Sequence, residues 1–314
     1  YLTLATRDDL PAWTGELRSG ARANVLMGVA SNRVDVKQAA ARAERVLEQE
    51  AEPLSALFLP PTRWPGALRA ATQPAPGEAF TFVVVNDTHY KSPECGMWLK
   101  QVVAAMQREK PAFCLHVGDI VDDGRRDHLA TVRGVMAEIG VPVYVQIGNH
   151  DYDSETGRSA YEELFPDRLN YGFEHQGWQF LGVDSTEGKK WERTRIAEAS
   201  LQWVDRQLAR LDRNRPLVLF THFPLADGVQ FQPGNASALL ERFRDLNLQA
   251  VFNGHFHGYT DHAFQHARVT TNRCCALRVG NFDGTTEKGF FVCTAGPGGV
   301  TRRFVEVLPT PGLL

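Results

Sequence analysis

The chain has 314 residues, of which 43% are hydrophobic and 23% are charged, a composition typical of a globular protein and not of disorder, collagen or a coiled coil. Lys and Arg together number 34 against 37 Asp and Glu, which gives a net charge of -3. Because this balance supplies no overall positive field, we expect no nucleic acid polymer as a partner. No stretch approaches the roughly 20 apolar residues that span a bilayer, so no membrane span is predicted.

The first 78 residues differ in pattern from the remainder of the chain. Residues 36–51 carry Ala, Arg, Glu and Leu at helical spacing, which predicts one helix. Residues 60–78 are rich in Pro and Gly, which central strands and helices do not tolerate, and they are interpreted as a linker. The predicted organisation is an N-terminal extension over residues 1–78 and a main domain over residues 79–314.

Between residues 80 and 307, short apolar runs alternate with longer amphipathic stretches, a pattern that indicates an α/β domain with buried strands. The predicted strands cover residues 80–85, 113–117, 143–147, 217–220 and 250–252. The predicted helices cover residues 97–108, 129–139 and 200–211. A hairpin is predicted from residues 171–173 and 178–184, and short strands separated by Gly turns fill residues 270–307.

Polar clusters follow five of these strands at their C-terminal ends, where open α/β sheets place their sites. They are Asp87-Thr88-His89, Gly118-Asp119, Gly148-Asn149-His150-Asp151, His222 and Gly254-His255-Phe256-His257. Carboxylate and imidazole suit zinc, manganese and iron, and the Asp-x-His and His-x-His spacings put both ligands on one side of an extended segment. The set is too large for one metal, whereas two metals about 3.5 to 4 Å apart would use it fully. Most of these pieces alone are common, and Gly-His-x-His is rarer. Their joint occurrence, with five of the ten His residues, predicts a metal site.

The ordered set resembles the calcineurin-like metallophosphoesterase superfamily over about residues 80–308. The resemblance implies a four-layer α/β/β/α sandwich of two mixed sheets flanked by helices, which agrees with the predicted strands. It also implies two divalent or mixed-valence metal ions, of Fe, Mn or Zn. One metal would be held by Asp87, His89, Asp119 and His257, and the other by Asp119, Asn149, His222 and His255. His150 matches the family histidine that contacts the phosphate and helps the leaving group depart.

The details of the motifs are closest to the class III cyclic nucleotide phosphodiesterases. Asp122 stands where purple acid phosphatases carry a tyrosine ligand, so a coloured ferric-tyrosinate centre is not expected. The implied function is a dinuclear-metal-dependent hydrolase of small phosphate esters, in which a metal-bound hydroxide attacks phosphorus in line, and a phosphodiesterase is favoured. A phosphomonoesterase acting on a small phosphorylated metabolite would use the same metals. A catalytically degenerate binding scaffold is disfavoured because no ligand is missing.

Four further residues are candidates for supporting roles. Asp122 and Asp151 are predicted to orient loops or metal-bound imidazoles, because such rings commonly donate their other N–H to an acceptor. Arg125 and Tyr152 are candidates for binding substrate: Arg125 could meet an anionic group, with an exposed loop residue as its alternative, and residues 151–170 are expected to line the cleft. His116, within a predicted buried strand, receives no role.

The cysteines and the first residue point to different compartments. The five Cys lack the paired spacing of a disulfide framework or zinc site, and they favour a reducing compartment. Most are interpreted as core residues, with a redox pair of Cys274 and Cys275 as the alternative for those two. A start at Tyr1 instead of Met favours export. The localisation and the oligomeric state are therefore left open.

Overall fold

The structure is a computed structural model that describes residues 2–4, 13–15 and 78–313. Its contacts divide the chain into two units, Tyr1–Leu57 and Phe58–Leu314. In the first unit, the short strands β1 (Leu2–Leu4) and β2 (Trp13–Gly15) pair antiparallel and were not predicted. The predicted helix over residues 36–51 lies outside the described residues, as does the linker apart from residue 78. The boundary at residue 78 stays a prediction.

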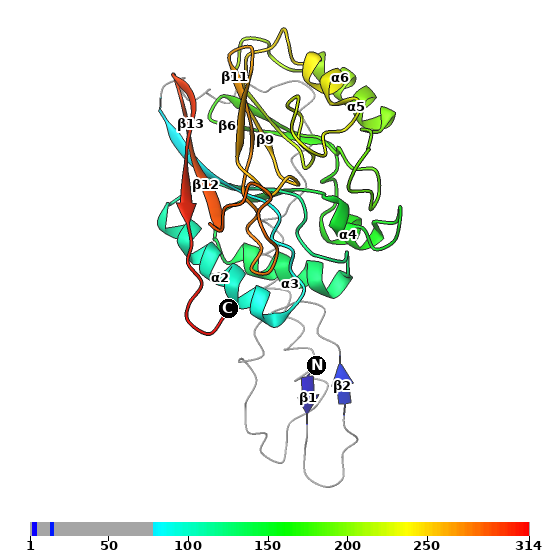
Figure 1. Cartoon of the computed structure of the whole chain (residues 1–314), viewed down its shortest axis with the longest axis vertical. Helices are drawn as coiled ribbons and strands as arrows, with labels where there is room; N and C mark the ends of the chain where they lie inside the picture. Colours follow the sequence, from blue (N-terminus) through cyan, green and yellow to red (C-terminus); the bar gives the residue numbers. More distant parts are fainter. Residues whose placement is uncertain (1, 5–12, 16–77, 314) are drawn as a thin grey trace. The chain divides into compact units, whose positions relative to one another are not determined.

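The first large sheet has five strands in the order β13-β12-β3-β4-β5. Its members are β3 (Phe80–Val85), β4 (Cys114–Val117), β5 (Val143–Gln146), β12 (Gly289–Gly296) and β13 (Gly299–Glu306). The first three of these are parallel, and β12 and β13 extend the sheet in antiparallel fashion. The parallel strands are joined by helices α2 (Pro93–Arg108) and α3 (Arg126–Ala137), which lie side by side in Figure 1.

The second large sheet has six strands in the order β10-β11-β9-β8-β7-β6. Its members are β6 (Tyr171–His175), β7 (Trp178–Gly182), β8 (Leu217–Phe220), β9 (Leu248–Asn253), β10 (Thr260–Phe264) and β11 (Ala267–Thr271). The four inner strands are parallel and the two edge strands are antiparallel to their neighbours. Helices α5 (Glu198–Leu208) and α6 (Ala236–Glu241) lie between consecutive strands of this sheet.

The core lies in layers because successive strand residues point to opposite faces. In β3, Phe80, Phe82 and Val84 pack into an aromatic core shared by the two sheets. In β8, Phe220 joins the same core, whereas Leu219 packs on the opposite face in a second cluster with residues of α5 and α6. Figure 1 shows α2 and α3 on one side of the sheets and α5 and α6 on the other. The predicted α/β/β/α sandwich of two mixed sheets is therefore confirmed.

Most of the predicted elements are present, with shifted ends. Helix α2 begins at Pro93, four residues earlier than predicted, because proline at the first helical position carries the fixed φ that a helix needs. The short helices α4 (Ser159–Leu164) and α6 and the edge strand β10 were not predicted. All five cysteines are free and buried, which agrees with their interpretation as core residues. Within the part of the chain that the structure describes, no helix combines the length and the apolar character needed to cross a bilayer.

Candidate metal centre

The loops after β3, β4, β5, β8 and β9 bring together the seven side chains that the sequence predicts as metal ligands. None of them is more than 7% exposed. They are Asp87, His89, Asp119, Asn149, His222, His255 and His257. Within each sheet the motif-bearing strands run parallel, so their C-terminal ends meet at one edge.

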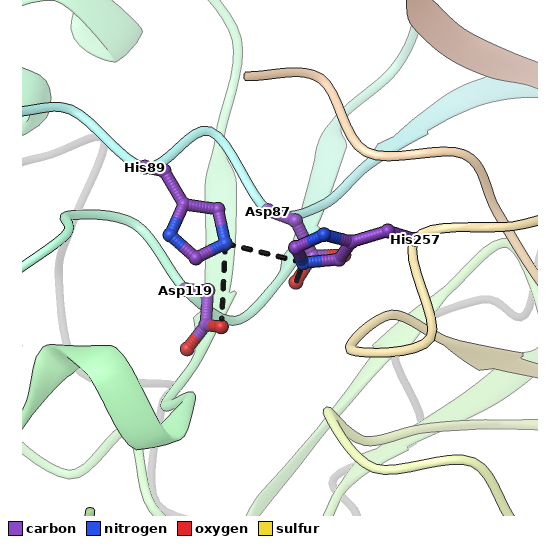
Figure 2. A group of neighbouring side chains, drawn as sticks. All are labelled: Asp87, His89, Asp119 and His257. Carbon is purple, nitrogen blue, oxygen red and sulfur yellow. Dashed lines mark hydrogen bonds and ion pairs between the residues drawn. The ribbon is translucent and has the colours of Figure 1, made fainter. Parts of the chain in front are cut away.

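One group of donor atoms comprises Asp87, His89, Asp119 and His257, which Figure 2 shows converging on one point. The Nε2 atoms of His89 and His257 are 3.2 Å apart. His89 Nε2 lies 3.5 Å from Asp119 Oδ2, and His257 Nε2 lies 3.4 Å from Asp87 Oδ1. Two imidazole nitrogens and two carboxylate oxygens that face one another within 4.8 Å suit a divalent cation.

A second group is built around the other oxygen of Asp119. Asp119 Oδ1 lies 3.3 Å from His222 Nε2, which is in turn 3.2 Å from His255 Nδ1. Asn149 Oδ1 also lies 3.2 Å from His222 Nε2. Asp119 therefore belongs to both groups, one oxygen in each, as a carboxylate that bridges two metals would.

The electrostatics of the cluster also fit bound cations. Burial raises the pKa of the Asp119 carboxyl, but the neighbouring His222 and His150 more than offset this, so that its pKa is well below the usual range. Burial lowers the pKa of His222, yet the carboxylates of Asp119 and Asp87 raise it to about 9. Burial and the charge of His222 lower the pKa of His255 to about 3. Without metal, a proton on His222 thus compensates the buried carboxylates, and a cation would take its place.

The backbone at the ligands is unusual. Of the eleven non-glycine residues with positive φ among those described, five are predicted ligands. They are Asp87, His89, Asp119, His255 and His257, with φ between 41° and 63°. Such conformations are uncommon outside glycine and gather at functional sites.

Two glycines of the motifs make room for the ligands. At Gly118, φ is +94° and an added Cβ would lie 2.5 Å from Nδ1 of His222. At Gly148, an added Cβ would overlap the backbone nitrogen and Oδ1 of Asp119. These glycines therefore allow the tight turns that bring the ligand side chains close together.

The outer nitrogens of three rings have acceptors that orient them. His222 Nδ1 lies 3.0 Å from the carbonyl oxygen of Val117, and His255 Nε2 lies 2.7 Å from that of Trp191. His89 Nδ1 lies 3.2 Å from Oδ1 of Asp122. Carbonyl and carboxylate oxygens accept these hydrogen bonds, so the outer nitrogen of each ring carries a proton, and the lone pair of the inner nitrogen would be the one that a bound metal uses.

The other predicted orienting residue, Asp151, ties two motif loops together. Its carboxylate accepts the backbone N–H groups of Val121 at 3.0 Å and Gly148 at 2.8 Å. Burial and the charge of Asp119 raise its pKa to about 7, in spite of these two hydrogen bonds. Asp151 therefore positions the loops after β4 and β5 and does not belong to either group of donor atoms.

His150 lies beside the cluster on its more open side. Its side chain is 39% exposed, and its ring centre lies 4.7 Å from that of His89. Its Nδ1 lies 2.9 Å from the carbonyl oxygen of Asp122, which leaves Nε2 available. Burial lowers its pKa, but the charges of Asp119 and Asp122 raise it overall. His89, Asp122 and His150 also form a third grouping of potential donor atoms, outside the two groups that share Asp119.

The two substrate-binding candidates are not brought into the cluster. The exposed Arg125 forms a paired interaction with Asp127, at 3.0 and 2.7 Å. Tyr152 is 3% exposed, and its hydroxyl bonds Thr186 at 2.7 Å. Tyr161 and Phe165 are fully buried, so the aromatic side chains of residues 151–170 pack inside the fold instead of lining a cleft.

Sequence reasoning missed other residues at the site. The buried His116 lies with Nε2 3.0 Å from Oγ1 of Thr88, and so links β4 to the first motif loop. Burial lowers its pKa to about 4, which keeps the ring neutral; its place within an apolar strand was the available signal. Trp191, Phe231 and Phe282 contact the ligand histidines from three loops that carry no motif.

Two groups of buried donor atoms that share one carboxylate, at the strand ends of a two-sheet sandwich, define a dinuclear metallohydrolase. A family model described as calcineurin-like phosphoesterase matches residues 80–259. This match covers more than half of the chain, which therefore belongs to the calcineurin-like phosphoesterase family. The protein is a phosphoric ester hydrolase with a dinuclear metal centre.

Relatives in sequence are diesterases by name. The chain is 25% identical over 213 residues to the glycerophosphodiester phosphodiesterase GpdQ of Enterobacter lignolyticus, covering 60% of this chain and 74% of the relative. It is 28% identical over 199 residues to a probable cyclic nucleotide phosphodiesterase of Rhodopseudomonas palustris, covering 56% and 71% of the two chains.

Solved structures share the fold at lower identity. A dimetal phosphatase from Danio rerio has a TM-score of 0.57 at 18% identity, covering 73% of this chain and 98% of its own. A purple acid phosphatase from yellow lupin has a TM-score of 0.57 at 15% identity, covering 74% of this chain and 52% of its own. At these identities the likeness concerns the fold alone.

Proposed function

We propose that the protein is a phosphodiesterase for small phosphate esters and that its two metal ions share Asp119. The first metal would bind Asp87, His89, Asp119 and His257, and the second Asp119, Asn149, His222 and His255. The observation that carries this assignment is the division of the Asp119 oxygens, with Oδ2 facing His89 and Oδ1 facing His222. A carboxylate placed in this way would hold two cations at the short separation that two-metal hydrolysis needs.

The donor set also limits the identity of the metals. It consists of imidazole nitrogens and carboxylate and amide oxygens, and it contains no thiolate. Such a set suits Fe, Mn or Zn in preference to the soft metals that thiolates select. When bound, the metals would lower the pKa of a coordinated water and draw charge from the phosphoryl oxygens.

The side chains around the metals have separate tasks in this proposal. The carbonyl of Asp122 holds Nδ1 of His150, so Nε2 of His150 is the atom that would hydrogen-bond a phosphoryl oxygen or protonate the leaving oxygen. The Asp122 carboxylate orients the ring of His89. Arg125 and Tyr152 are given no task in this proposal: the exposed Arg125 pairs with Asp127, and the hydroxyl of the buried Tyr152 bonds Thr186.

A diester substrate is supported by the named activities of the relatives from Enterobacter lignolyticus and Rhodopseudomonas palustris. We expect faster hydrolysis of bis(p-nitrophenyl) phosphate than of p-nitrophenyl phosphate, with a cyclic nucleotide as a further substrate to assay. The reverse order of rates would make the protein a phosphomonoesterase.

The test of the metal assignment is Asp119→Asn, which keeps the shape of the side chain and removes its charge. We expect about two metal ions per chain in the unaltered protein, and loss of both bound metal and hydrolysis in the variant. Elemental analysis and the diesterase assay measure the two quantities on the same sample. Asp127→Asn is the matched control, because that carboxylate is 64% exposed and pairs with Arg125. Retention of metal and activity in Asp119→Asn would exclude the shared-carboxylate centre.

A further inference from the structure

Three aromatic side chains form a continuous strip beside the metal centre. The rings of Trp191 and Phe231 are 5.5 Å apart, and those of Phe231 and Phe282 are 5.9 Å apart. Trp191 is 54% exposed and Phe282 is 59% exposed, while Phe231 between them is half-buried. The three residues, called the aromatic strip below, come from the loops before α5, before α6 and before β12.

The aromatic strip contacts one histidine of each of the two donor groups that share Asp119. The ring of Phe282 stacks on that of His257 at 5.4 Å, with 7° between the planes. The ring of Phe231 lies 5.4 Å from that of His255. The carbonyl of Trp191 lies 2.7 Å from Nε2 of His255, and the Phe282 N–H donates to the carbonyl of His257 at 3.1 Å. The aromatic strip therefore lies within reach of a group attached to a phosphate bound at this centre.

The strip is not explained by the packing of the core. Among the residues described, five large hydrophobic side chains are exposed, and two of them belong to the strip. Phe231 also has a φ of 68°, a conformation that is rare and strained for a bulky side chain. Exposed aromatic surface gathered at one place indicates a binding site.

We propose that the aromatic strip binds a planar aromatic ring carried by one ester group of the substrate, as in a nucleoside or an aryl alcohol. This inference rests on the proposed diesterase function, because a diester keeps a second organic group next to the metals. Stacking needs only a ring with a π-face and tolerates different rings. The strip would thus set specificity for the ester group, while the metals act on the phosphate.

The test compares two diesters that differ only in the aromatic character of one group. Benzyl p-nitrophenyl phosphate and cyclohexylmethyl p-nitrophenyl phosphate share their leaving group, the CH₂ next to the ester oxygen and nearly the same bulk. We expect kcat/KM to favour the benzyl ester by about tenfold, the effect of roughly 1.4 kcal/mol of stacking. We expect Trp191→Ala and Phe282→Ala each to reduce this ratio severalfold, and the double variant to bring it to about one.

Controls separate stacking from damage to the site. Trp191→Ala keeps the carbonyl that faces His255, and metal content is measured for every variant. Trp191→Phe retains a ring and should keep most of the preference, whereas Leu308→Ala removes a side chain that is 73% exposed and outside the strip, and should leave the ratio unchanged. Equal rates for the two esters in the unaltered protein, or an unchanged ratio in the double variant, would overturn the proposal.

A binding measurement tests the aromatic strip independently of the proposed diesterase function, because it does not require cleavage of the ligand. Calorimetric titration of the metal-loaded protein with benzyl phosphate and cyclohexylmethyl phosphate should rank the two ligands in the same order as the turnover assay. If neither diester is cleaved, the proposed diesterase function fails, and equal affinities in this titration would refute the strip independently. Thymidine 5′-(p-nitrophenyl phosphate) then distinguishes the sources of the ring: a higher kcat/KM than the benzyl ester indicates a nucleoside, and a lower one indicates an aryl alcohol.

Discussion

The side chains at the metal centre show how well the role of a single residue can be predicted from the motif that surrounds it in the sequence. Asp119 follows Gly118 at a strand end, and its spacing predicts a ligand; its two oxygens then face different histidines. Tyr152 follows the third motif in the same way, yet it is buried and its hydroxyl bonds Thr186. Adjacency to a motif therefore predicts backbone position, whereas the direction of a side chain depends on contacts from elsewhere in the fold.

His150 provides a test of chemistry separate from metal binding. We expect His150→Ala to lower kcat by about 10² to 10⁴, the usual contribution of a positioned acid or phosphate contact. Its Nδ1 is held by a backbone carbonyl, and it is outside the two donor groups that share Asp119, so bound metal should persist. Kinetics and elemental analysis of one preparation measure both quantities.

The control for His150 is an exposed histidine away from the cluster. His262 lies on the edge strand β10 and has an exposed side chain, so His262→Ala should behave as the unaltered protein. Loss of metal from His150→Ala would instead make His150 a ligand, through its grouping with His89 and Asp122.

The loops at the strand ends are packed so closely that one added methyl group should disturb the metal centre. We expect Gly148→Ala to displace Asp119, because the added Cβ would overlap the backbone nitrogen and a carboxylate oxygen of that residue. Bound metal and hydrolysis should fall together in this variant, as measured by elemental analysis and the diesterase assay.

Gly134→Ala is a matched control, because it makes the same glycine-to-alanine change inside a helix and not in a loop of the metal centre. Gly134 lies inside helix α3, where an added Cβ would meet nothing within 4 Å. Gly134→Ala should therefore keep activity and stabilise the protein by about 0.5–1 kcal/mol, since glycine is disfavoured in helix interiors. A Gly148→Ala protein with full metal content would show that the loop can shift at no cost to the site.

The predictability of an element depends on its length and position in the sheets. Strands β3 and β8 match their predicted ranges, because buried parallel strands are continuous apolar runs. Helix α6 has six residues and strand β10 is half-exposed at an edge, so neither contains enough periods of a pattern to be recognised. The aromatic strip was not predicted for another reason. Its three residues lie in loops that carry no motif, and these loops come together only when both sheets have formed.

The sandwich as a whole contains buried charges that depend on the metals. Asp87 and Asp119 are almost completely inaccessible, and bound cations would balance their negative charge. We expect chelation to lower the melting temperature and added Mn²⁺ or Zn²⁺ to restore it, since a ligand at 100 times its Kd stabilises the folded state by about 2.7 kcal/mol. Thermal melts with and without chelator measure the change.

The same melts on Asp119→Asn show whether the stabilisation arises at the proposed centre. That variant should have one melting temperature under both conditions, because it no longer holds the metals. A melting temperature of the unaltered protein that chelation leaves unchanged would contradict the role of the cations in stability.

The centre draws its side chains from both sheets, and this has a mechanical consequence. Asp87 follows a strand of the first sheet, and His257 follows a strand of the second, 170 residues further along the chain. Cations coordinated by both residues would cross-link the two sheets at the C-terminal ends of their strands. This cross-link would close a long loop of the chain without a covalent bond. Loading with metal should therefore slow hydrogen exchange at the C-terminal ends of β3 and β9 more than at the N-terminal ends of the same strands.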